Sequence, residues 1–117
     1  MRKGLCLLLL LTAVAGCDKA ATPPPAEGAA LSLAPADPKL AKLYAQTCKS
    51  CHTSPASGAP RAGDKAAWGP RLAQGLPTLV QHASGGYKGM PPMGSCPDCS
   101  EKELTALVAF MSGAPAP

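Results

Sequence analysis

The stretch "QTCKSCHTS", residues 46–54, is the most informative part of the chain. It places Cys48 and Cys51 three positions apart and puts His52 directly after the second cysteine. This spacing suits a zinc site, a reactive dithiol, or a point where a cofactor is bound covalently. The compartment, the remaining cysteines and the helix pattern of the chain distinguish among these three chemistries.

The N-terminal residues 1–16 have the pattern of a secretory signal peptide. "MRKG" is a short basic region, and the apolar run "LCLLLLLTAVA" after it is too short to span a bilayer comfortably. The run ends in "VAGC", which resembles a bacterial lipobox and predicts that Cys17 becomes a lipidated N-terminus. A plain secretory signal followed by an unrelated cysteine is the alternative. Both interpretations place the domain outside the cytoplasm, and the lipobox predicts a lipid-anchored protein on the periplasmic side of a bacterial membrane.

The rest of the chain divides into a linker, one domain and a short tail. Residues 17–36 are rich in Ala and Pro, so we expect the lipidated N-terminus to continue into a linker with little that could pack. The compact domain is expected over residues 37–114, with a tail at 115–117. The formal net charge of +4 falls to +2 when Arg2 and Lys3 leave with the signal. A charge this small predicts no nucleic-acid partner.

The domain shows helical signals, which predict an all-α fold. Asp37 is suited to cap a helix that runs to Cys48. Ser100 and Glu103 have the spacing of a capping box, and apolar residues then recur at helical intervals. A third short helix is expected over residues 78–83. The remainder has the composition of loops, and no segment alternates as a strand would.

The chemistry of the C-x-x-C-H motif favours haem over the other two possibilities. Two thiolates at this spacing can bind the two vinyl groups along one porphyrin edge, and the adjacent histidine then lies beneath the iron. Cys48 and Cys51 would be the attachment points and His52 the proximal ligand. A zinc site remains open on spacing alone, because Cys96 and Cys99 form a second C-x-x-C pair. A redox dithiol has less support, since no βαβ pattern surrounds the motif.

Three motifs, in order along the chain, resemble those of class I c-type cytochromes, and most closely the bacterial cytochrome c5 group. "LYAQTCKSCH" resembles the N-terminal helix that leads to the haem motif, and "WGPRL" resembles the proline segment. "GMPPMGSCPDCSEKEL" resembles the methionine loop that leads to the last helix. The resemblance covers about residues 40–112. It implies a small class I cytochrome c fold, with three to five short helices around one covalent haem c.

The resemblance also implies roles for residues around the haem. Met90, which precedes two prolines, corresponds to the axial ligand opposite the histidine, whereas Met93 is a competing sulfur that we expect to pack in the loop. The carbonyl of Pro70 is expected to accept a hydrogen bond from Nδ1 of the proximal histidine. Trp68 and Arg71 are the nearest side chains for hydrogen bonds to the haem propionates.

The second cysteine pair has a structural role under the same resemblance. Ser100 follows Cys99, so this pair is no second haem motif. A local disulfide between Cys96 and Cys99 is expected to brace the segment between the methionine loop and the last helix. Tyr44 and Phe110 resemble the aromatic contact where the terminal helices cross, which is a packing role.

These assignments predict an electron carrier and no enzyme activity. Both axial positions of the iron would be filled, which leaves no open site for an organic substrate. The predicted partners are redox proteins, such as a respiratory complex, a terminal oxidase or a reductase, together with the membrane through the lipid. The alternatives are a haem enzyme or a gas or redox sensor with a displaceable Met90, and a structural zinc module.

Overall fold

The computed structural model describes residues 27–115. The predicted signal peptide, Cys17 and the first part of the expected linker lie outside the described residues. The elements in chain order are α1 (Glu27–Ser32), α2 (Pro38–Gln46), α3 (Lys49–His52), η1 (Pro55–Ser57), α4 (Lys65–Leu72), α5 (Leu76–Gly85), η2 (Pro92–Ser95) and α6 (Glu101–Ser112). None of the helices over residues 27–115 is long and apolar enough to cross a membrane.

The prediction of an all-α fold is confirmed. Five of the α-helices, α2 to α6, lie within residues 37–114, in agreement with the expected three to five, but α4 lies in a stretch that was expected to be loop. The helix expected over residues 78–83 is present and longer, since α5 covers Leu76–Gly85. The extended pairing found in residues 27–115 is one isolated bridge between Tyr87 and Met90.

Local sequence determines where α2 and α6 begin. The Oδ1 atom of Asp37 accepts a hydrogen bond from the Leu40 amide at 2.8 Å, which satisfies one of the free N–H groups of the first turn. Ser100 and Glu103 form the reciprocal capping box at the start of α6. A salt bridge joins the first turns of α2 and α6, since Lys39 Nζ lies 2.6 Å from Glu103 Oε1.

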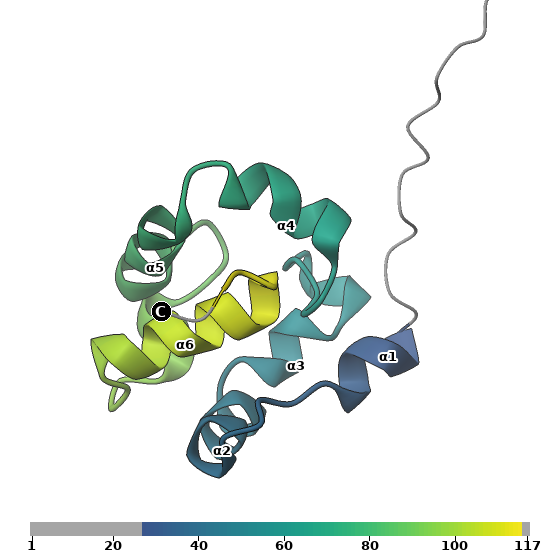
Figure 1. Ribbon diagram of the computed structural model, residues 1–117, viewed down its shortest axis with the longest axis horizontal. Coiled ribbons are helices and arrows are strands. Elements are labelled where there is room, and N and C mark those ends of the chain that lie inside the picture. The colour runs from purple at the N-terminus through teal and green to yellow at the C-terminus, as the bar shows by residue number, and fades with distance from the viewer. Residues whose placement is uncertain (1–26, 116–117) are drawn as a thin grey trace, which may run out of the picture.

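Helix α6 is the central element against which the others pack. Figure 1 shows α2, α4 and α5 around it, and each of these helices contacts α6. Tyr44 of α2 and Phe110 of α6 meet edge to face, with ring centroids 5.1 Å apart and an interplanar angle of 76°. Leu107 and Met111 are among the most completely buried side chains of the core. The terminal helices therefore cross at an aromatic contact, as the sequence predicted.

The expected linker is wrong in its last part. Residues 27–32 form helix α1 instead of an extended tether, and Ala30 is completely buried. The segment is rich in alanine, so its composition resembles that of a linker. The sequence pattern does not reveal that Ala30 is buried or that Leu33 lies against Gly63.

Candidate cofactor site

One cavity of about 420 Å³ is lined by the residues that the motifs singled out. Its volume lies within the range of about 300–1,000 Å³ typical of ligand and cofactor sites. The first wall comes from the end of α2 and from α3, with Cys48, Cys51 and His52. The lining also includes Met90 and Gly94 from the loop between α5 and α6, together with His82 of α5 and Met111 of α6. Two thiols, two imidazoles and two thioethers therefore line a single cavity, and the motifs single out Cys48, Cys51, His52 and Met90 among them.

Helix α3 presents the C-x-x-C-H residues as one helical turn. The His52 amide donates to the Cys48 carbonyl at 3.0 Å, so the three side chains project from a single turn of the chain. Both thiols are free: Cys48 is buried and Cys51 is exposed. Burial raises the pKa of the Cys48 thiol, and this outweighs the hydrogen bond from Thr47.

His52 is buried and has a defined tautomer. Its Nδ1 atom lies 2.8 Å from the carbonyl oxygen of Pro60. A carbonyl can only accept, so Nδ1 carries the proton and Nε2 keeps its lone pair. Burial lowers the pKa of His52, against the opposing effect of the Pro60 hydrogen bond, and the charge of Arg71 lowers it further. The ring is therefore a neutral imidazole, which is the form that binds a metal.

The prediction for the Pro70 carbonyl is wrong, because Pro60 occupies that role. Pro70 lies inside helix α4 and lines the cavity, but the hydrogen bond to the imidazole comes from the loop before that helix. A second hydrogen bond, at Ala62, explains why Pro60 lies beside the imidazole. The Ala62 amide donates to the His52 carbonyl at 2.7 Å, which holds the loop directly beside the histidine. Nothing in the sequence distinguishes Pro60 from the other loop prolines.

Trp68 does not offer its indole N–H to the cavity. Its Nε1 donates to the Arg61 carbonyl at 2.8 Å, so the predicted hydrogen bond to a propionate is wrong for this side chain. The ring instead stacks on His52, with centroids 5.9 Å apart and planes at 18°. Arg71 lines the cavity, while its Nη1 donates to the carbonyl of Ala67 within α4. Arg71 remains a candidate for the propionates, and Trp68 supports the imidazole.

The structure separates the two methionines of the loop. Met90 exchanges two backbone hydrogen bonds of 3.0 Å with Tyr87 and lines the cavity that contains His52. A Cβ built on Gly94 would lie 3.0 Å from Met90 Cε, so the methyl end of the thioether lies directly against the Gly94 backbone. Two hydrogen bonds hold the backbone of Met90, and its methyl end packs against this glycine.

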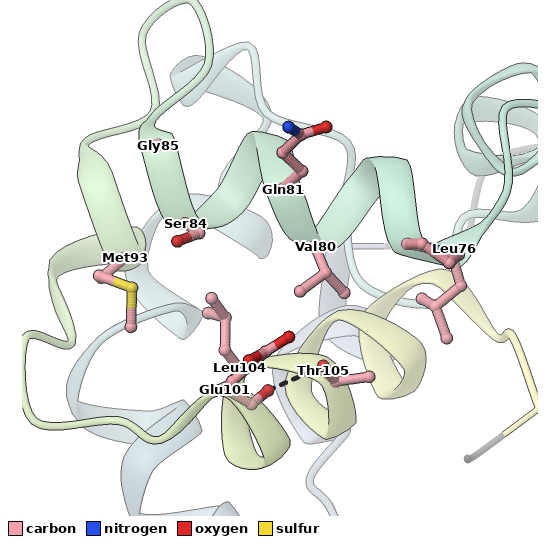
Figure 2. Close-up of a pocket in the computed structure, with 10 residues that line it drawn as sticks. Leu76, Val80, Gln81, Ser84, Gly85, Met93, Glu101, Leu104 and Thr105 are labelled. Atoms are coloured by element: carbon pink, nitrogen blue, oxygen red, sulfur yellow. Dashed lines mark hydrogen bonds between the residues drawn. The ribbon is translucent and has the colours of Figure 1, made fainter.

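Met93 points elsewhere. Figure 2 shows it in a second hollow between α5 and α6, of about 730 Å³, together with Val80 and Leu104. Its backbone has φ 58° and ψ 10°, a left-handed conformation, and Met93 does not line the first cavity although Pro91 and Gly94 on either side of it do. Its role as a packing side chain agrees with the partial burial of Met93 against the core.

Two aromatic residues at the cavity were not expected there, because the sequence favoured a solvated helix-end position for His82 and gave Tyr87 no role. His82 and Tyr87 both line the cavity, and their rings stack with centroids 4.2 Å apart and planes at 17°. Tyr87 is 43% exposed, so this pair forms part of the cavity rim. The two residues lie on either side of the end of α5, and no local pattern indicates that they meet.

The second cysteine pair forms a disulfide in the structure. Cys96 and Cys99 are bonded, with Cα atoms 5.4 Å apart, at the start of the segment that leads to α6. The four-cysteine zinc site is inconsistent with this bond, because two of its ligands are no longer free. Residues 27–115 contain no group of three or more His, Cys, Asp or Glu side chains that could hold a metal ion. The donor set fits a covalently attached haem instead.

Comparisons with known proteins place the same stretch in one family. The sequence model of a family described as "Cytochrome C oxidase, cbb3-type, subunit III" matches residues 35–111. Cytochrome c-555 of Chlorobaculum tepidum is 43% identical over 74 residues, which are 60% of this chain and 68% of that protein. Cytochrome c5 of Azotobacter vinelandii is 42% identical over 73 residues, which are 61% of this chain and 88% of that protein.

A solved structure is also similar to this chain. It is the "Crystal structure of electron transfer complex of nitrite reductase with cytochrome c", and the matching chain has a TM-score of 0.59 and 44% identity. The match covers 67% of this chain and 95% of that chain.

Proposed function

This chain belongs to the c-type cytochrome family, and from that membership we propose that it is a membrane-tethered, periplasmic electron carrier with His52 and Met90 as its iron ligands. The family binds haem c covalently, and Cys48 and Cys51 supply the two cysteines of the attachment motif. The observation that carries the proposal is that these four side chains line one cavity. When bound, haem supplies an iron that changes oxidation state by one electron.

The residues of this chain account for the remaining requirements of a carrier. The Pro60 carbonyl holds the proton of His52 on Nδ1, which leaves Nε2 free to bind. The paired backbone hydrogen bonds at Tyr87 hold Met90 at the cavity, and its weak thioether donor needs such support. With both positions filled by protein side chains, no site remains for an organic substrate. A Met ligand also raises the reduction potential relative to a second nitrogen ligand.

The proposed partners are redox proteins outside the cytoplasm. The similar solved chain comes from an electron transfer complex with nitrite reductase, and this supports a reductase as one class of partner. The proposed location follows from the lipobox-like "VAGC" and from the acyl chains that Cys17 would carry. Two such chains are enough for stable attachment to a membrane.

The test is the visible spectrum of the full-length protein, reduced with dithionite, before and after addition of carbon monoxide. We expect a low-spin c-type spectrum that carbon monoxide leaves unchanged. Met90→Ala should open the iron to carbon monoxide, remove the near-infrared sulfur-to-iron band of the oxidised protein and lower its potential. Met93→Ala is the matched control and should change none of these, because its side chain lies in the other hollow.

Each alternative function has its own outcome in this experiment. Binding of carbon monoxide by the unaltered protein would show that the methionine is displaceable and would favour a sensor or enzyme. If the effects fall on Met93→Ala, the assignment of the axial ligand is wrong. A protein without a Soret band contains no haem, and the proposal then fails entirely.

A further inference from the structure

The segment before α2 packs against the domain although it precedes the stretch that the family shares. The family model begins at residue 35, whereas Ala30 is completely buried and Leu33 is 37% exposed. A Cβ built on Gly63 would lie 2.9 Å from Leu33 Cδ1, so the leucine methyl sits directly against the glycine backbone. Gly63 has a φ of 77°, a conformation that also favours glycine.

The residues just before Gly63 support the imidazole of His52. The Pro60 carbonyl accepts from His52 Nδ1 at 2.8 Å, and the Ala62 amide donates to the His52 carbonyl at 2.7 Å. The Arg61 carbonyl accepts from Trp68 Nε1 at 2.8 Å, and the Trp68 ring stacks on the imidazole. Three consecutive loop residues therefore hold the ring, its backbone and the aromatic side chain stacked on it.

We propose that Leu33 is a positioning residue, which clamps the 60–63 loop and through it fixes the orientation of the His52 ring. The loop contains no helix of its own, and Gly63 is tied to α6 by one hydrogen bond, from its amide to the Met111 carbonyl at 2.8 Å. The contact with Leu33 adds apolar packing at the same glycine. Leu33 follows α1 directly and lies in the segment that joins the domain to the proposed tether. This segment would therefore help to fix the orientation of the proximal histidine.

The consequence concerns the strength of the imidazole as a donor. A hydrogen bond from Nδ1 to a carbonyl fixes the ring and raises its basicity. If the loop loosens, the bond to Pro60 lengthens and the imidazole becomes a weaker donor. A weaker donor stabilises the oxidised iron less, so the reduction potential rises. This inference rests on the proposed role of His52 as an iron ligand, but not on where the protein is located or which partners it has.

The test compares Leu33→Ala with Leu31→Ala in the full-length, haem-containing protein. Leu31 is the matched control, since it is 50% exposed in the same segment and does not lie against Gly63. Proton exchange is measured by NMR in the reduced protein at the His52 Nδ1–H and at the Ala62 amide, and the reduction potential is measured in parallel. Removing three carbon atoms from a leucine that is about two-thirds buried should make loop opening, and hence exchange at both protons, roughly tenfold faster.

The expected result is faster exchange and a raised potential in Leu33→Ala, little change in Leu31→Ala, and recovery of both values in Leu33→Ile. A lower Tm for Leu33→Ala with unchanged exchange and potential would overturn the proposal, because the contact would then be merely structural. Equal effects of both alanine variants would also overturn it. The visible spectrum of the wild-type protein tests the proposed function separately. If that spectrum is low-spin and unaffected by carbon monoxide while Leu33→Ala has no effect, this inference fails and the proposed function stands.

Discussion

Replacing Tyr44 by Phe should stabilise the protein, because the tyrosine hydroxyl is buried without a partner. Tyr44 is 1% exposed, and its Oη is a buried side-chain polar atom for which the structure shows no hydrogen bond. Burial, and to a smaller extent the neighbouring Cys48, raises the pKa of Tyr44, so the hydroxyl stays protonated at ordinary pH. A buried polar group without a partner costs about 1–3 kcal/mol.

The substitution removes this cost and keeps the packing. Phe retains the ring that meets Phe110 at 5.1 Å, and only one oxygen atom is lost from the interior. We expect a net gain of about 1 kcal/mol after the small void is allowed for. For a domain of this size, that corresponds to a rise in Tm of about 4–8 °C.

The assay is thermal unfolding of the oxidised holoprotein, followed by circular dichroism in the far ultraviolet. Tyr87→Phe is the matched control, since Tyr87 is 43% exposed and removal of its hydroxyl should leave Tm nearly unchanged. A decrease in Tm for Tyr44→Phe would refute the reasoning, because the hydroxyl would then have to be paired. Equal increases in both variants would point to a general effect of the substitution and not to burial.

Two further predictions concern the helix ends and the anchor. Lys39, followed by Ser100, lowers the pKa of Glu103 from its usual 4.5 to about 2. The stability that this carboxylate contributes is therefore present above pH 4.5 and is lost as the pH falls towards 2. Glu103→Gln should flatten the dependence of Tm on pH between these two values. An unchanged slope in the variant would contradict this prediction. Cys17→Ser should release the protein from the membrane fraction or leave an uncleaved precursor, whereas mature protein that stays membrane-bound in high salt would refute the lipid anchor.

The residue patterns that predicted structure correctly without the family resemblance act over a few positions. Asp37 caps α2, and Ser100 with Glu103 caps α6, because a cap links a side chain to an amide three residues away. The C-x-x-C-H motif likewise lies on one turn of the chain at α3, so its chemistry is visible in five consecutive residues. The all-α class followed from such helical signals.

Tertiary structure alone decided which residues support the site. Pro60 and not Pro70 bonds to His52, since that contact depends on the path of a loop with no regular local conformation. The Trp68 indole N–H is used within the fold by the loop carbonyl of Arg61. The contact of Leu33 with Gly63 joins segments that are distant in the chain.

The two methionines show the same division between sequence and structure. Sequence and resemblance favoured Met90 because two prolines follow it and make its backbone extended. The left-handed φ of 58° at Met93 has no local cause, because methionine does not prefer that region. The structure places the Met93 side chain in the hollow between α5 and α6, and the Met90 side chain at the cavity that contains His52. The sequence by itself thus determined the chemistry and the starts of α2 and α6, whereas contacts between distant segments decided which neighbours surround each reactive side chain.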